Sequence, residues 1–262
     1  AVHGVPQHLG GDPPDHRAHG VGFVVGGEEE QDRSRHPLML GSPTIEPSTR
    51  WTLRRAMLLV GLVVALASAA GIPARAAVGA QVAADEPQYL LTAGALYHRL
   101  DLDIGPDLRA ETYRAYHRAE LPQQTAELPG GQRLSPHDPL LPVVLAVPFG
   151  IGGWVGAKVA LSLLAGALAA VLLWTAVVRF RVPLGPAAAV VAGFGLVPPL
   201  LSYGSLVYPE LPAALAVAVA VAGLAGSPSR RTTAAWVVAV VCLPWLAVKY
   251  APVAAAVALV GL

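Results

Sequence analysis

Long apolar segments separated by short polar ones dominate the chain from Trp51 onward and constrain its fold more than any other feature. A transmembrane helix needs about 20 predominantly apolar residues. Segments of roughly this kind cover residues 57–76, 154–178, 186–201, 211–226 and 234–262. The pattern predicts an all-α fold: a polytopic transmembrane helical bundle with about five spans.

Composition supports the same class. The sequence is 54% hydrophobic and only 13% charged, about half the charged share of an ordinary soluble domain. Its net charge is +1 and its basic residues are scattered. A nucleic-acid partner is not expected, because phosphate binding needs clustered Lys and Arg. The expected surroundings are membrane lipids.

Residues 1–50 differ sharply from the rest. They are rich in Gly, Pro, His and charged residues and show no apolar periodicity. Such a segment buries too little surface to offset its chain entropy, so we expect a disordered polar tail. The sequence begins with Ala rather than Met, so the authenticity of this tail is itself a hypothesis, which peptide mapping of the native protein tests. Residues 51–262 form the predicted transmembrane domain.

Basic residues predict the orientation, because they concentrate on the cytoplasmic side of membrane proteins. A topology with a cytoplasmic N-terminus places all three basic clusters inside: residues 50–55, 179–181 and 230–231. The same topology makes residues 77–138 the first extracytoplasmic loop and also exposes residues 202–210 and 248–250 outside. We therefore expect a multi-pass protein of the plasma membrane.

Two segments are ambiguous in this topology. Residues 139–153 are apolar but short and broken by Pro and Gly, and a full crossing there would place Arg179 and Arg181 outside. We expect a re-entrant or interfacial helix instead. The first span, which follows Arg54 and Arg55, also resembles a cleavable signal peptide. In both cases the loop after it is extracytoplasmic.

An acidic pair, Asp85 and Glu86, begins the next helical pattern. Pro87 suits the first turn of a helix, and apolar residues follow at roughly helical spacing. The pattern predicts an amphipathic juxtamembrane helix lying along the membrane surface. Its acidic end would lie near the lipid headgroups. A simpler alternative is that both carboxylates only cap the helix and stay solvated.

The order of several short motifs resembles the N-terminal half of a membrane glycosyltransferase of the GT-C superfamily. The motifs are "DEPQYL" (85–90), "SPHDPLLPVVLAVPFGIGG" (135–153), "YPE" (208–210) and "PWLAVKYAP" (244–252). The chain is most similar to bacterial relatives of protein O-mannosyltransferases and lipid A aminoarabinose transferases. The resemblance covers the layout of residues 51–262.

The resemblance implies transfer of a sugar, with inversion, from a polyprenyl-phosphate donor to an acceptor at the outer face of the membrane. In this family, an acidic residue of the first outer loop acts as the catalytic base or helps to bind a metal. We expect Asp85 to be the base that takes the acceptor's proton. Glu86 would then have a supporting or metal-linked role, with a divalent metal as the cofactor if one is needed. The sequence identifies neither the sugar nor the acceptor.

Four further residues are candidates for donor or substrate contacts. His137 and Asp138 lie in the "HDP" motif, although Asp138 could instead cap a helix. Glu210 follows the "YP" dipeptide and could be a second acidic group or a helix cap. Lys249 could stabilise the leaving phosphate, or extend to ordinary lipid phosphates.

Two alternatives to an enzyme remain. Broken apolar segments such as "GLVPPLLSYG" (195–204) are typical of the discontinuous helices of secondary transporters. Transporters, however, usually place ionisable groups at mid-membrane, whereas most charge here lies outside the predicted spans. The chain also stops at Leu262 within an apolar segment, so we expect it to be truncated relative to the family. A non-catalytic fragment of a membrane protein is therefore the third hypothesis.

Overall fold

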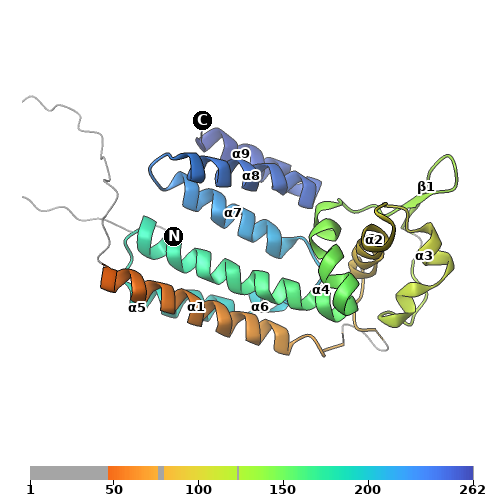
Figure 1. The fold of residues 1–262 in the computed structure, drawn as a ribbon, viewed down its shortest axis with the longest axis horizontal. Helices are drawn as coiled ribbons and strands as arrows, with labels where there is room; N and C mark the ends of the chain where they lie inside the picture. The colour runs from red at the N-terminus through yellow and green to blue at the C-terminus, as the bar shows by residue number, and fades with distance from the viewer. Residues whose placement is uncertain (1–46, 76–79, 123, 262) are drawn as a thin grey trace, which may run out of the picture. The chain divides into compact units, whose positions relative to one another are not determined.

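A computed structural model describes residues 47–75, 80–122 and 124–261 (Figure 1). These residues form an almost entirely helical unit, which confirms the all-α prediction. The one small sheet is a hairpin of two short antiparallel strands. The α-helices and strands in chain order are α1 (Pro47–Ala70), α2 (Glu86–Arg99), α3 (Gly105–Arg109), β1 (Ala126–Glu127), β2 (Arg133–Leu134), α4 (Leu140–Trp174), α5 (Leu184–Gly195), α6 (Leu200–Tyr203), α7 (Glu210–Leu224), α8 (Arg230–Leu246) and α9 (Ala251–Gly261).

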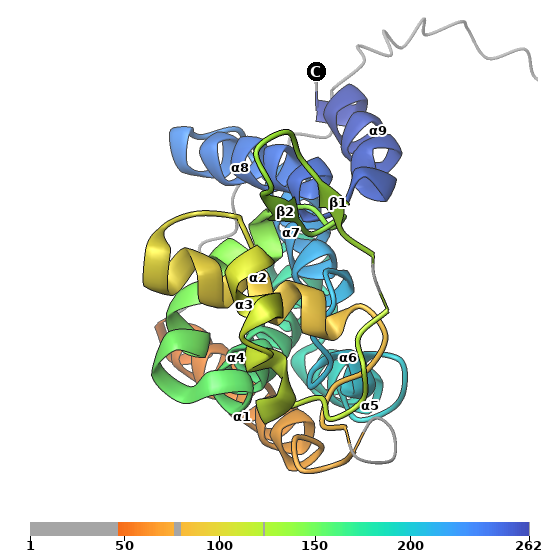
Figure 2. The same ribbon diagram turned by 90° about the vertical axis from the view of Figure 1, so that its right-hand side faces the viewer.

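The long helices lie side by side around α4. Helix α1 packs on one side of α4 and α7 on the other, while α8 packs on α7 and α9 on α8 (Figures 1 and 2). Helix α2 packs against α4, and α3 and the β1–β2 hairpin lie at the same end of the unit (Figure 1). The segment predicted from the sequence to be the first extracytoplasmic loop therefore has its own structured elements at one end of the helices.

Two glycines let α1 and α4 approach closely. A Cβ atom on Gly61 would lie 2.9 Å from the carbonyl oxygen of Gly166, and one on Gly166 would lie 2.5 Å from the carbonyl oxygen of Gly61. No larger side chain fits either position without a shift of the helices. Small residues at such a crossing are typical of helix pairs that pack without a hydrophobic driving force between them.

Among the described residues, two helical segments are long and apolar enough to cross a membrane: Arg50–Ala70, and Leu140–Arg179, in which a π-helical turn (Thr175–Arg179) extends α4. Only 28% and 44% of their most apolar windows are buried inside the protein, so large apolar side chains face outward. Among them are Leu58, Leu62 and Leu66 of α1 and Val155, Val159 and Leu163 of α4. Many large apolar side chains exposed on two neighbouring helices are typical of a surface that a lipid or a protein partner covers.

The remaining apolar helices are shorter than the sequence pattern suggests. The 186–201 segment breaks into α5, with 12 residues, and α6, with 4. Helix α7 has 15 residues, and the last segment divides into α8 and α9. Prolines explain part of this result: Pro198 and Pro199 separate α5 from α6, because Pro lacks the N–H that a continuing helix needs. Within the residues that the structure describes, the expected five spans of full length are therefore not confirmed.

The expected separate helix at 139–153 is present as the first part of α4. Gly153 has φ 58° and ψ −151° and breaks the helical geometry there, a conformation that favours glycine. Beyond the break, Gly156 packs against the backbone of Pro148 so closely that a Cβ would not fit. Residues 140–152 thus form a helical segment distinct from the long segment that follows.

The structure corrects the expected position of α2. Residues Glu86–Ala95 are all buried, and only the C-terminal end of the helix, near Tyr97 and Arg99, is exposed. Helix α2 is therefore not an amphipathic helix lying on a surface. Its apolar side chains Leu90 and Leu91 belong to the main core together with Leu141 and Leu145 of α4. The helical spacing was correct, but packing partners cover both faces.

The predicted boundary at residue 50 also shifts. Helix α1 already begins at Pro47, where proline's fixed φ suits a first helical turn. The predicted disordered tail otherwise lies outside the described residues. At its other end α1 stops at Ala70, six residues before the predicted end, and the turns at Gly71 and Ile72 precede Pro73.

Candidate functional site

Polar residues from four separate parts of the chain meet around Tyr89 of α2. Burial of the ring has the largest effect on its phenol, and the negative charges of Asp85, Glu210 and Asp138 add to that effect. Burial and these carboxylates together raise the pKa of Tyr89. The structure thus brings together residues that the sequence separates by more than 120 positions.

Asp85 is the most available of these carboxylates. It is the N-cap residue of α2, but its side chain makes no capping hydrogen bond. The side chain is 43% exposed, and Gln124 Nε2 donates to Oδ1 over a long 3.5 Å. Its main-chain carbonyl accepts from the N–H groups of Gln88 and Tyr89. The backbone is therefore fixed while the carboxylate remains free to act on a ligand.

His137 lies between Asp85 and Tyr89. Its ring stacks on that of Tyr89, with centroids 4.5 Å apart and planes at 22°. Its Nε2 is 3.9 Å from Asp85 Oδ1, too far for a hydrogen bond, and this nitrogen has no partner among the described residues. Burial lowers the pKa of His137, although the charges of Asp85 and Asp138 oppose that shift. His137 Nε2 is thus a buried nitrogen without a hydrogen-bond partner beside Asp85.

Asp138 joins the start of α4 to the segment after α8. Its Oδ2 accepts the N–H of Val248 at 3.0 Å, and α4 has Pro139 as its N-cap residue without a side-chain cap. The suggested helix-capping role is therefore wrong. Because Val248 precedes Lys249, this hydrogen bond also holds the short 3₁₀ turn Val248–Tyr250 near the "HDP" motif.

Glu210 and Lys249 form an ion pair. Lys249 Nζ lies 2.7 Å from Glu210 Oε1, while Glu210 Oε2 has no hydrogen-bond partner among the described residues. Glu210 is the first residue of α7, and no side-chain cap forms there. The pair is partly exposed, so its ammonium can also reach a bound anion.

Glu86 has a structural position that the sequence did not reveal. Its side chain is 1% exposed, so the idea that both acidic side chains stay solvated is wrong. Oε2 accepts the N–H of Ala83 and Oε1 accepts the N–H of Val207, each at 2.8 Å. Both oxygens are therefore occupied by backbone donors.

The expected metal role of this pair does not fit the geometry. The Glu86 oxygens are already engaged, which leaves Asp85 without an adjacent carboxylate ligand. Within the described part of the chain, no three His, Cys, Asp or Glu side chains lie close enough together to hold a metal ion. We therefore derive no step through a metal at this site.

Tyr89 is the residue that sequence reasoning missed. It lies four positions after Asp85, one helical turn along the same face, and this spacing was visible in "DEPQYL". Tyr250, next to Lys249, also acts on the Tyr89 phenol. Only the fold could show that these two tyrosines, 161 positions apart in the sequence, lie near each other.

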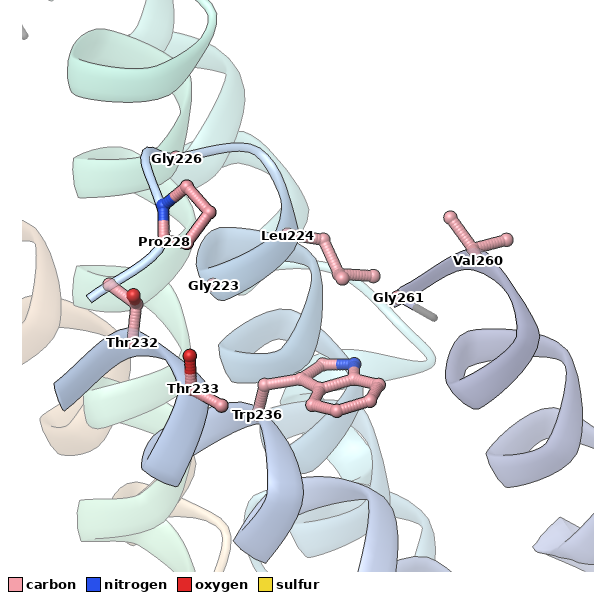
Figure 3. Close-up of a pocket in the computed structure, with 9 residues that line it drawn as sticks. All are labelled: Gly223, Leu224, Gly226, Pro228, Thr232, Thr233, Trp236, Val260 and Gly261. Carbon is pink, nitrogen blue, oxygen red and sulfur yellow. The ribbon is translucent and has the colours of Figure 1, made fainter. Parts of the chain in front are cut away.

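A cavity lies at the C-terminal end of α7, whereas Glu210 is at the N-terminal end of that helix. Figure 3 shows its lining of small, apolar and hydroxyl side chains between α7, α8 and α9, including Leu224, Thr233, Trp236 and Val260. None of its described lining residues is charged. Thr232, which also borders it, is committed to the capping box with Ser229 at the start of α8. The cavity brings no titratable group to a ligand.

Comparison with known proteins gave no further constraint on the site. No protein-family model matches the chain, and neither a curated protein nor a solved structure matches it.

Proposed function

We propose that this protein is an integral membrane glycosyltransferase that moves a sugar from a polyprenyl-phosphate donor to an acceptor at the outer face of the membrane. The observation that carries the proposal is the cluster of Asp85, His137 and the Glu210–Lys249 pair at one end of two membrane-length helices. A lipid-linked donor cannot leave the bilayer, so transfer must occur at such a boundary.

Asp85 is the proposed base. As the acceptor hydroxyl oxygen attacks the anomeric carbon, the Asp85 carboxylate takes the hydroxyl proton. The bond from that carbon to the phosphate oxygen breaks, and polyprenyl phosphate leaves with the electron pair. Attack from the side opposite the phosphate inverts the anomeric centre. The partial exposure of Asp85 and its lack of a capping hydrogen bond support this role.

Lys249 and His137 are proposed to bind the substrates. The Lys249 ammonium would stabilise the charge on the departing phosphate, with Glu210 holding the amine in position. His137, whose buried Nε2 has no hydrogen-bond partner among the described residues, would accept a contact from a sugar or acceptor hydroxyl that enters beside Asp85. Asp138 is a positioning residue, since it fixes the backbone before Lys249.

The topology belongs to the same proposal. We propose a multi-pass arrangement in the plasma membrane, with the N-terminal end of α1 cytoplasmic. Arg54 and Arg55 lie at that end of α1, and Arg179 and Arg181 follow α4. The candidate site would then face outward, together with α2, α3 and the hairpin.

Transfer from a radiolabelled polyprenyl-phosphate sugar, measured in membranes that contain the full-length protein, tests the function. Asp85→Asn should abolish transfer while insertion into the membrane is unchanged. Asp101→Asn is a matched control, because the Asp101 side chain is 45% exposed and ion-paired to Arg99 in the same loop. Full transfer by Asp85→Asn would remove Asp85 from the base role.

A transporter is the second candidate, and two observations favour it. The apolar segment at 186–201 is discontinuous in the structure, and Lys158 is buried within α4. Discontinuous helices and intramembrane charges are typical of transporter substrate sites. Uptake of labelled sugars into proteoliposomes, with no sugar transfer, would favour this candidate over the enzyme.

A further inference from the structure

A cavity of about 510 Å³ lies between the end of α1, α4 and α6. Its volume falls within the range of about 300–1,000 Å³ typical of small-molecule sites. The lining combines two basic side chains, Lys158 and Arg75, with three serines, Ser68, Ser202 and Ser205. Apolar residues such as Ala67 and Leu201 complete it.

The charged residues of the lining are all basic. Among the described residues that border the cavity, none is Asp or Glu. Lysine and arginine supply cationic hydrogen-bond donors, and serine hydroxyls add neutral ones. A ligand that matches this lining carries negative charge and several acceptor oxygens.

Lys158 makes the lining more than a surface basic patch. Its side chain is 2% exposed, and Nζ donates to the carbonyl oxygen of Gln81 at 2.9 Å. The ring of Trp154 lies 5.7 Å from Nζ. Within the described part of the chain, no carboxylate lies within ion-pair distance of this ammonium, although the charge of Glu86 acts on it from farther away.

A buried charge without a contacting counter-ion is costly, and proteins usually pair it or place it at a functional site. A bound anion would supply the missing counter-ion. Lysine also has three N–H donors, of which the Gln81 carbonyl takes one. An anion with several oxygens could therefore accept from Nζ without displacing the existing hydrogen bond.

The position of the cavity favours a lipid as the source of that anion. Ala67, which lines it, follows Leu66, whose side chain is 60% exposed on the apolar face of α1. The cavity thus borders the surface that we propose to be covered by acyl chains. Arg75, which is exposed and follows the end of α1 at Ala70, would then contact the lipid headgroup.

We propose that this cavity binds a phosphate group through Lys158 and Arg75, and that the phosphate belongs to a lipid headgroup. The lining of this cavity shares no residue with the Asp85–His137 and Glu210–Lys249 pairs. The proposed phosphate site is therefore made of other residues than the proposed sugar-transfer site.

Thermal unfolding of the purified full chain in a neutral detergent tests the proposal. The probes are short-chain phosphatidylglycerol, short-chain phosphatidylcholine and inorganic phosphate. A ligand that binds only the folded state raises the unfolding temperature in proportion to its affinity. We expect a rise with phosphatidylglycerol that exceeds the rise with phosphatidylcholine.

Variants of Arg75 locate the bound probe. Arg75→Glu should weaken the apparent affinity for phosphatidylglycerol at least about tenfold, because it replaces a charge-assisted hydrogen bond with repulsion. Arg75→Lys should keep most of the affinity. Arg118→Glu, an exposed arginine of the first loop that does not line the cavity, is the matched control. Lys158→Met is less informative, since its loss could prevent folding.

The possible outcomes distinguish a lipid headgroup from free inorganic phosphate as the bound ligand. A shift with phosphatidylglycerol that Arg75→Glu removes and Arg118→Glu retains supports the lipid site. If inorganic phosphate gives this shift and neither lipid does, the cavity binds phosphate and the lipid assignment is overturned. No shift with any probe, or shifts that are equal in all variants, overturns the proposal. Because the readout needs no sugar transfer, its failure is distinct from failure of the proposed enzyme function.

Discussion

Glu86 Oε1 accepts the backbone N–H of Val207 at 2.8 Å, across 121 positions of sequence. The same carboxylate accepts the N–H of Ala83 through its other oxygen. One buried side chain therefore connects the start of α2 to the segment that leads into α7. Asp85, the proposed base, is held next to this connection.

Removing the Glu86 carboxylate should destabilise the fold. Glu86→Ala leaves two buried backbone N–H groups without acceptors, and we expect a loss of about 3 kcal/mol in the free energy of unfolding. Chemical unfolding in detergent measures the change. Glu120→Ala, at an exposed position in the first loop, should stay within about 0.5 kcal/mol of the wild type.

The two acidic residues also differ in their expected effects on activity. Glu86→Gln keeps one acceptor oxygen, so it should lower the free energy of unfolding and have little effect on the rate of sugar transfer. Asp85→Asn should do the opposite: it should lower the rate of transfer with little change in stability. If Glu86→Gln folds normally and loses all transfer, Glu86 has a catalytic role that its hydrogen bonds do not explain.

Substitution of Gly166 should separate α1 from α4. Gly166→Leu forces a side chain against the Gly61 carbonyl, and overpacking of this kind costs about 1–3 kcal/mol or more. The same substitution at Gly193 of α5, where a Cβ would meet no atom within 4 Å, should cost nothing or slightly stabilise the helix. Thermal unfolding of both variants in one detergent makes the comparison. Equal unfolding temperatures would show that the crossing tolerates larger residues.

Helical content was predictable from the sequence, but helix lengths were not. The apolar pattern of residues 57–76 correctly indicates α1 as far as Ala70, because no proline interrupts residues 57–70, whereas Pro73 follows the end of the helix. Residues 186–201 gave a similar hydropathy signal, yet they split into α5 and α6 at Pro198 and Pro199. Hydropathy measures where a segment prefers to lie, not whether its backbone can continue as one helix.

The sequence was enough to name several residues of the candidate site, but not the contacts between them. Asp85, His137 and Lys249 were identified from short motifs, and the fold brings these motifs to one end of the helices. The pairing of Glu210 with Lys249 and the burial of Glu86 depend on tertiary packing. Spacing along one helix carries no information about a partner on another.

His137 should make stability depend on pH. Burial lowers the pKa of His137 in the folded state, so the unfolded chain binds a proton more readily than the folded one. Below the unfolded pKa of about 6.5, stability should fall as the pH decreases towards the folded pKa, and above it this contribution is constant. Asp85 and Asp138 oppose the shift and limit its size.

The variant His137→Phe isolates this contribution, because it keeps an aromatic ring against Tyr89 but cannot titrate. Between about pH 7 and pH 5, the unfolding temperature of the wild type should fall more steeply than that of His137→Phe. Parallel curves for the two proteins would mean that protonation of His137 does not penalise the fold.

Lys249 distinguishes a catalytic charge from a structural one. Its ion pair with Glu210 is partly exposed, with side-chain exposures of 57% and 27%, and exposed pairs contribute about 1 kcal/mol or less. Lys249→Gln should therefore change stability little. If its ammonium stabilises the leaving phosphate, the same substitution should slow transfer from a polyprenyl-phosphate sugar about 100-fold. Lys249→Arg, which keeps the charge, should restore part of the rate.

Glu210→Gln should have a smaller effect than Lys249→Gln, because it leaves the ammonium in place and removes only its positioning partner. Normal transfer by Lys249→Gln would instead assign Lys249 to the Glu210 ion pair alone.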